Sequence, residues 1–168
     1  MLTLIIGGSA SGKSEYAENH MLSLDGKRVY LATMEPFGDE GRIARHREKR
    51  SGRGFLTVEC YTDLRRAELP ERANVLLEDL GNLTANELFS PAGGGPAGLR
   101  SGLEDLMGRC RHLTVVTNEI FSGGRDYAGD TLSYMRELAR VNIWLASRAD
   151  LAVEVVCGLP NVLKEAKA

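Results

Sequence analysis

Cysteines and long apolar runs are scarce in this sequence, and their scarcity argues against several classes of protein. Cys60, Cys110 and Cys157 are odd in number, far apart and without C-x-x-C spacing, so neither a disulfide framework nor a zinc site is indicated. No segment approaches the roughly 18 apolar residues that span a bilayer. The start, MLTLIIGG, has neither a positive leader nor a cleavage site. We therefore expect a soluble, cytoplasmic protein with no membrane span and with reduced, mostly buried thiols.

An excess of positive charge is also missing. The formal net charge is −2 and the isoelectric point is near 6, which argues against a general nucleic-acid binder and leaves only a local basic patch open. The chain has 168 residues, of which 43% are hydrophobic and 26% charged, and this is enough to bury a real core. We predict a single domain over residues 1–168.

Apolar, β-rich segments alternate with longer segments of helical period along the chain. Short continuous apolar strands separated by helices are typical of βαβ crossovers and of a mostly parallel sheet with helices on both faces. We therefore predict an α/β fold. The breaker cluster SPAGGGPAG at 90–98 predicts a flexible surface loop. The predicted strands are 3–6, 28–33, 55–59, 74–78, 112–117 and 151–156.

A phosphate-binding loop follows the first predicted strand. The stretch GGSASGKS matches the pattern G-x-x-x-x-G-K-[ST] and leads into the helical pattern SEYAENHML. In such a loop, backbone N–H groups surround the phosphate oxygens, and the next helix adds the positive end of its dipole. We expect Lys13 to reach the β- and γ-phosphates and Ser14 to bind Mg²⁺. The predicted cradle consists of Gly7, Gly8, Ser9, Ala10, Ser11, Gly12, Lys13 and Ser14.

Polar residues end two later strands. A phosphate-binding loop needs a carboxylate at the end of a neighbouring strand to hold the metal ion or its water. NVLLED offers Glu78 and Asp79, of which we favour Glu78, and the alternative is that both are ordinary strand-end acids. The strand HLTVVTNE ends on residues 117–119 at the edge where ligands bind in open α/β sheets, although polar residues are expected wherever a strand meets water.

The basic stretch RIARHREKR at 42–50 contains one histidine among five cations. If this stretch is helical, Arg42, His46, Lys49 and Arg50 share one face. Neighbouring cations disfavour the imidazolium, so His46 is expected to be neutral near neutral pH, with a lone pair free for nucleophilic attack. Three interpretations stay open from the residues alone: a solvated basic face, a phosphoryl or nucleotidyl acceptor, and an RNA-binding face.

Several segments occur in an order that resembles a known enzyme family. They are GGSASGKSEYAE, YLATMEP, RIARHREKR, FLTVECYTDL, LLEDLGNLTANELF, VVTNE and the closing ARVN to GLP region. Together they resemble the bifunctional adenosylcobinamide kinase/adenosylcobinamide-phosphate guanylyltransferase family of cobalamin biosynthesis, over almost the whole chain. The resemblance implies a P-loop NTPase fold with a mostly parallel, RecA-like sheet, and a homo-oligomer that is a trimer.

The resemblance also implies a reaction in two parts. A nucleoside triphosphate, GTP or ATP, first phosphorylates the aminopropanol hydroxyl of adenosylcobinamide with Mg²⁺ present. GTP then guanylylates that phosphate through a GMP–histidine intermediate on His46 and releases pyrophosphate. The residues that match nucleotide contacts of the family, beyond the cradle, are Ala32, Thr33, Met34, Arg47, Glu48, Lys49, Arg50, Glu59 and Glu78.

Some positions depart from the family's usual pattern. Ala10 replaces a common Arg, Phe121 a common Gly and Ile143 a common Gln, and FSGGRDYAG lacks the usual Val-Pro. These departures bear on the kinase half and on the fit of the corrinoid more than on guanylylation. Two other functions stay open: a P-loop kinase for another small metabolite, and a non-enzymatic GTP-binding regulator. The second is weakened because the sequence has no N-K-x-D motif for reading guanine.

Overall fold

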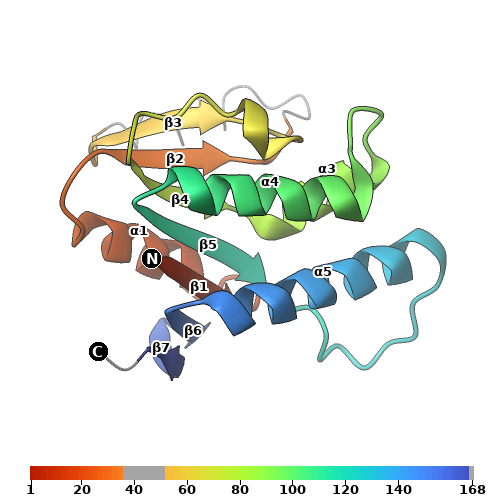
Figure 1. Ribbon diagram of the computed structural model, residues 1–168. Helices are drawn as coiled ribbons and strands as arrows, with labels where there is room; N and C mark the ends of the chain where they lie inside the picture. The colour runs from red at the N-terminus through yellow and green to blue at the C-terminus, as the bar shows by residue number, and fades with distance from the viewer. Residues whose placement is uncertain (36–51, 167–168) are drawn as a thin grey trace.

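One twisted sheet organises the molecule (Figure 1). A computed structural model describes residues 1–35 and 52–166. The sheet order is β3-β2-β4-β5-β1-β6-β7, in which β7 alone is antiparallel to its neighbour. All six predicted strands form within this sheet, so the α/β prediction is confirmed. The strands are β1 Leu2–Gly7, β2 Arg28–Ala32, β3 Phe55–Glu59, β4 Asn74–Glu78, β5 His112–Asn118, β6 Leu151–Val156 and β7 Leu159–Glu165.

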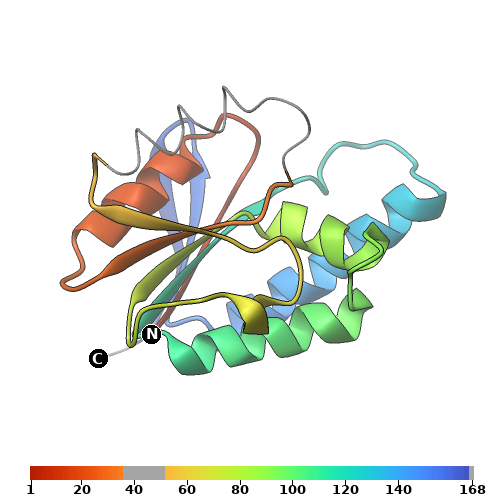
Figure 2. The same cartoon turned by 90° about the horizontal axis from the view of Figure 1, so that it is seen from above.

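Helices cover both faces of the sheet (Figure 2). Helix α1 (Lys13–Leu22) lies on one face, where Ala17 and Met21 pack with Ile5. Helices α3 (Leu80–Phe89), α4 (Gly95–Arg109) and α5 (Gly129–Arg148) lie on the other, in the larger core that includes Leu4, and a short 3₁₀ helix η1 (Leu64–Arg66) packs beside α4. Alternation along β1 therefore sends neighbouring side chains into opposite cores.

The register of the parallel strands brings their carboxyl ends to one edge. Ala32 of β2 pairs with Glu59 of β3 on one side and with Glu78 of β4 on the other. Gly7 of β1 pairs with Asn118 of β5. The predicted phosphate loop and both predicted acidic contacts thus leave the sheet at the same edge, where open α/β sheets bind ligands.

Strand β7 was not predicted from the sequence. All seven of its residues are exposed, so it lacks the buried, alternating face by which strands are recognised. Pro160 is compatible with it because β7 is an edge strand. A two-residue turn joins it to β6, in which Cys157 and Gly158 have φ values of 52° and 77°. Positive φ at both turn residues is the geometry that suits a two-residue hairpin.

Two other expectations need correction. The predicted flexible loop at 90–98 is wrong for its second half, because α4 begins at Gly95 with Pro96 in its first turn. Proline is tolerated there, since the first N–H groups of a helix have no intrahelical partner. The expectation of mostly buried thiols fails for Cys157, which is exposed on the β6–β7 turn. In the described ranges 1–35 and 52–166, no helix has the length and apolarity needed to cross a membrane.

Candidate active site

The phosphate loop is shaped by glycines at two crowded positions. A Cβ on Gly7 would lie 2.5 Å from Ser11 Oγ and 2.6 Å from the carbonyl oxygen of Val155. Gly12 has φ 91° and is the N-cap of α1, with no side chain capping the helix. The first turn of α1 therefore presents its N–H groups and its positive dipole end to whatever the loop surrounds.

Lys13, Ser14 and Glu78 meet at the carboxyl edge of the sheet. The Lys13 side chain is buried, and its Nζ donates to the Gly8 carbonyl oxygen at 3.1 Å. Ser14 Oγ donates to Glu78 Oε1 at 2.5 Å. Burial is the main reason that the pKa of Glu78 lies above its usual value, while the Ser14 hydrogen bond opposes that rise. A carboxylate whose charge is disfavoured here would be stabilised by a cation.

The residues present fit a magnesium ion. Glu78 Oε2 is buried with no hydrogen-bond partner, and it belongs to the side chain that Ser14 already contacts. Carboxylate and hydroxyl oxygens are the hard ligands that Mg²⁺ prefers. Among the described residues, no three His, Cys, Asp or Glu side chains form a cage. In kinases, Mg²⁺ is usually held by one or two protein oxygens together with water and substrate phosphates, and Ser14 and Glu78 offer two such oxygens.

The β6–β7 turn forms one wall of the phosphate loop, and this contact was not predicted from the sequence. Gly158 N–H donates to the carbonyl oxygen of Ser11 at 2.8 Å. A Cβ on Gly12 would lie 3.1 Å from Gly158 Cα. Because C=O and N–H of a trans peptide point in opposite directions, the bond to Gly158 directs the Gly12 N–H away from the turn. The usual sequence signals for such a turn are Asn-Gly and Asp-Gly, and the Cys-Gly pair here is neither, so the hairpin has no strong local signal.

Asp79 and the end of β5 make contacts within the protein. Asp79 is the N-cap of α3, and its Oδ1 accepts the Asn82 N–H at 2.7 Å. Its Oδ2 accepts from Asn118 Nδ2 at 3.3 Å. Glu119 accepts the N–H groups of Phe121 and Ser122 at 2.9 and 3.1 Å, and its hydrogen bonds, with that from Ser122 Oγ foremost, hold its pKa below the usual value. Of the two acids after NVLL, Glu78 is therefore the one that contacts the phosphate loop.

The remaining predicted nucleotide contacts differ in what they offer a ligand. Thr33 is fully buried, donates its hydroxyl to the Asp79 carbonyl oxygen at 2.7 Å and accepts from Asn86 at 2.8 Å through its own carbonyl. Met34 is 48% exposed. Glu59 accepts a hydrogen bond from the Tyr61 hydroxyl at 2.9 Å. It is the last residue of β3 and pairs with Ala32, the last residue of β2. The predicted residues His46, Arg47, Glu48, Lys49 and Arg50, with Arg42, lie outside the described residues.

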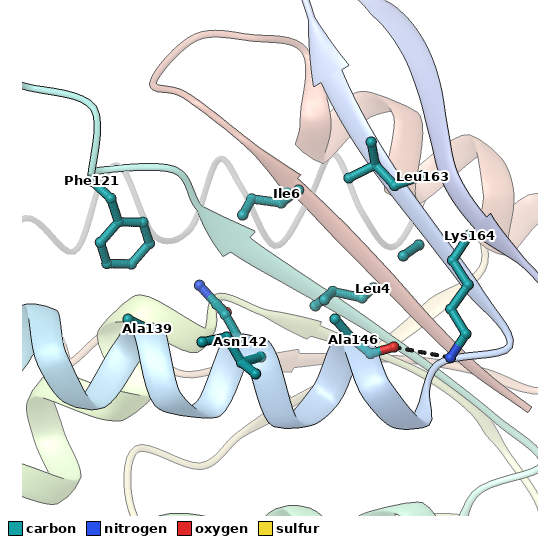
Figure 3. A pocket seen from close by; sticks show the side chains of 10 residues that line it. Leu4, Ile6, Phe121, Ala139, Asn142, Ala146, Leu163 and Lys164 are labelled. Atoms are coloured by element: carbon teal, nitrogen blue, oxygen red, sulfur yellow. Dashed lines mark hydrogen bonds between the residues drawn. The ribbon is translucent and has the colours of Figure 1, made fainter.

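Two positions that depart from the family pattern line one pocket, and Figure 3 labels the first of them, Phe121. Phe121 follows β5 and Ile143 is on α5, yet both line a pocket of about 470 Å³ between α5 and the β1–β6–β7 part of the sheet. Asn142 lines the same pocket and is only 8% exposed. Thr117 Oγ1 donates to its Oδ1 at 2.9 Å. Asn142 was not predicted from the sequence as a site residue.

Comparison with known proteins gives matches in sequence, to a family model and to two relatives, and a match in fold to one solved structure. The family model for cobinamide kinase/cobinamide phosphate guanyltransferase matches residues 3–163. The bifunctional adenosylcobalamin biosynthesis proteins CobU of Salmonella typhimurium and Escherichia coli are 31% and 28% identical, each over 98% of this chain and all of the relative. The flagellar accessory protein FlaH of Methanocaldococcus jannaschii has a similar fold, with a TM-score of 0.52, 12% identity and coverage of 98% of this chain and 78% of FlaH.

Proposed function

Because the chain belongs to the cobinamide kinase/cobinamide phosphate guanyltransferase family, we propose that it carries out both reactions in sequence, the second through a GMP–histidine intermediate on His46. The observation that supports a nucleotide-dependent transfer most directly is the meeting of Lys13, Ser14 and Glu78 beside an uncapped helix N-terminus. Helix N-termini of this kind bind anions. In P-loop enzymes, a lysine that contacts the phosphates and a hydroxyl that binds the metal act together with such an N-terminus.

In the kinase half, the loop of residues 7–14 binds the triphosphate of GTP or ATP. Lys13 exchanges its bond to the Gly8 carbonyl for contacts with the β- and γ-phosphates. The aminopropanol hydroxyl of adenosylcobinamide attacks the γ-phosphorus and loses its proton to solvent, the bond to the β-phosphate oxygen breaks, and the nucleoside diphosphate leaves. Ser14 and Glu78 would hold Mg²⁺, which neutralises phosphate charge when bound.

In the guanylyl half, neutral His46 attacks the α-phosphorus of GTP and pyrophosphate leaves. The phosphate of adenosylcobinamide phosphate then attacks the same phosphorus, which breaks the P–N bond, returns the electron pair to the imidazole and yields adenosylcobinamide-GDP. The covalent step divides a difficult phosphate-to-phosphate transfer into two displacements. Arg47, Lys49 and Arg50 follow His46 in the sequence, and such cations stabilise charge on the leaving pyrophosphate.

The test is covalent labelling with [α-³²P]GTP. The wild-type protein should acquire a label that is stable to alkali and labile to acid, as expected of a phosphoramidate. His46→Asn should acquire none, yet still bind GTP and still phosphorylate adenosylcobinamide, because γ-phosphoryl transfer does not pass through the imidazole. Label on the Asn variant, or on a lysine such as Lys49 in the wild type, would disprove the histidine mechanism.

The family resemblance also leads us to propose a cytoplasmic homotrimer. If the protein is a trimer, analytical ultracentrifugation should give the sedimentation coefficient of a particle made of three 18.3 kDa chains. A monomer at the concentration of the activity assay would contradict it. Fractionation of the native cells tests the location separately.

A further inference from the structure

We propose that the pocket between α5 and the β1–β6–β7 part of the sheet binds the amide-bearing rim of the corrinoid acceptor, with the Asn142 amide as donor to a corrinoid carbonyl. The inference rests on the proposed function, since it assigns a binding surface to the acceptor of that reaction. The pocket volume of about 470 Å³ is in the range of small-molecule sites.

The walls of the pocket are apolar and carry no available charge. The ammonium of Lys164, which lines the pocket, donates to the carbonyl oxygens of Ala146 and Ser147 at 3.1 and 3.0 Å, where it caps the end of α5. The pocket therefore favours a neutral ligand over an anion. Corrinoid rims are neutral and combine methyl groups with primary amides. The apolar walls include Leu4, Ile6, Ala139, Ala152 and Leu163.

One buried polar atom sets the chemistry of the ligand. Thr117 satisfies Asn142 Oδ1, whereas Asn142 Nδ2 is buried without a hydrogen-bond partner. In Figure 3 this nitrogen points into the pocket, toward Ile6 and Phe121. A buried donor without an acceptor costs free energy, which a ligand carbonyl would recover. An amide carbonyl within an otherwise apolar group is the chemistry that completes this pocket.

The pocket adjoins the phosphate loop through the chain itself. Ile6 lines the pocket and is followed directly by Gly7, the first residue of the loop. Phe121 lies two residues after Glu119, whose N–H donates to the Gly7 carbonyl oxygen at 3.0 Å. A corrin ring seated against Phe121 and Ile6 would leave its aminopropanol arm at the carboxyl edge of the sheet, where the phosphates bind.

A matched pair of substitutions on α5 tests the proposal. Ala139 lines the pocket, whereas its neighbour Arg140 is exposed and does not. Binding of cyanocobinamide is followed by quenching of Trp144, the single tryptophan. Ala139→Leu should fill the pocket and weaken binding at least about tenfold, while Arg140→Leu stays within about twofold of wild type. Asn142→Asp keeps an oxygen for Thr117 but removes the donor, and should weaken binding about three- to tenfold.

Three controls separate the possible failures. [α-³²P]GTP labelling should be unchanged in Ala139→Leu, because the pocket does not contact the nucleotide. If the wild type is labelled and binds cyanocobinamide, but Ala139→Leu binds it equally well, the pocket assignment is wrong and the proposed function stands. If the wild type is labelled and neither binds nor phosphorylates any cobinamide, the proposed function itself fails. If Ala139→Leu changes the sedimentation coefficient and not the affinity, a second copy of the chain occupies the pocket and the inference is overturned.

Discussion

Two glutamates, nine positions apart, differ in how far the fold uses their carboxylate oxygens. Glu87 on α3 is 2% exposed, and its two oxygens accept the N–H groups of Asp63 and Gly94 at 2.7 and 2.6 Å. Glu78 has one oxygen on Ser14 and the other buried without a partner. The first carboxylate has its acceptors used within the fold, whereas the second keeps an unused acceptor beside the phosphate loop.

The largest effect is expected at Lys13, which shares the Glu78 site. Lys13→Ala removes the cation that we propose contacts the phosphates, and should lower both activities at least about a hundredfold without unfolding the protein. Lys27→Ala is the control, because Lys27 has the same charge but is exposed immediately before β2. Initial rates and a thermal melt check this. Near-normal guanylylation in a folded Lys13→Ala variant would overturn the P-loop assignment.

The same substitution at the two glutamates should have opposite consequences. Glu78→Gln should cause a large loss of rate at low Mg²⁺ that is partly recovered at high Mg²⁺, with no loss of stability, because the amide removes a charge whose burial is unfavourable. Glu87→Gln places an amide NH₂ against one of two backbone N–H donors, and should cost about 1–3 kcal/mol of folding free energy. Its rate per folded molecule should stay that of the wild type.

Urea unfolding of both variants measures the free energy of unfolding, and a magnesium titration of both measures how the rate depends on Mg²⁺. If Glu78→Gln has the wild-type magnesium dependence, Glu78 does not act on the metal. If Glu87→Gln loses activity and keeps its stability, the contrast between the two glutamates is mistaken.

The pH dependence of stability should report on the burial of Glu78. The pKa of Glu78 is raised in the folded protein, mainly by burial. Its contribution to stability is therefore complete below the unfolded pKa and is lost as pH rises through the folded pKa. Without nucleotide or metal, the free energy of unfolding should fall less with rising pH above about 4.5 in Glu78→Gln than in the wild type. Identical slopes would mean that Glu78 ionises normally.

The smallest effect is expected at the β6–β7 turn. Cys157 and Arg72 are both exposed and have φ values of 52° and 51°, but only Cys157 lies next to the phosphate loop. Valine strains either position by about 1 kcal/mol or more. Only Cys157→Val should weaken binding of magnesium tripolyphosphate, by roughly two- to fivefold, through the Gly158 contact. Calorimetry measures both affinities, and equal affinities would show that the turn does not position the loop.

The sequence predicted most of the sheet because buried parallel strands are short, apolar and bounded by polar residues. The sequence also predicted the order of strand, glycine loop and helix at residues 2–22, because each of these three elements has its own recognisable pattern. Strand β7 was missed because an exposed edge strand carries no such pattern. Half of the 90–98 loop was misread because glycine and proline also begin helices, as Gly95 and Pro96 do.

The candidate site was predictable only where a motif fixes the residues. Lys13, Ser14 and Glu78 follow from the loop pattern and from a strand ending in an acid. The contact of Gly158 with Ser11 joins residues that are far apart in sequence, and no local pattern reveals it. The unused donor of Asn142 depends on how Thr117 orients the amide. Such features depend on the packing of strands and helices and become visible only in the fold.

The most direct test of the proposed chemistry is incubation of the wild-type protein with adenosylcobinamide, GTP and Mg²⁺, followed by mass analysis of the corrinoids. Both adenosylcobinamide phosphate and adenosylcobinamide-GDP should form, the phosphate first, and Lys13→Ala should form neither. His46→Asn should stop at the phosphate. If the wild type yields the phosphate alone, the chain is a kinase without the guanylyl step. If it yields no modified corrinoid while still binding GTP, the proposed function is wrong.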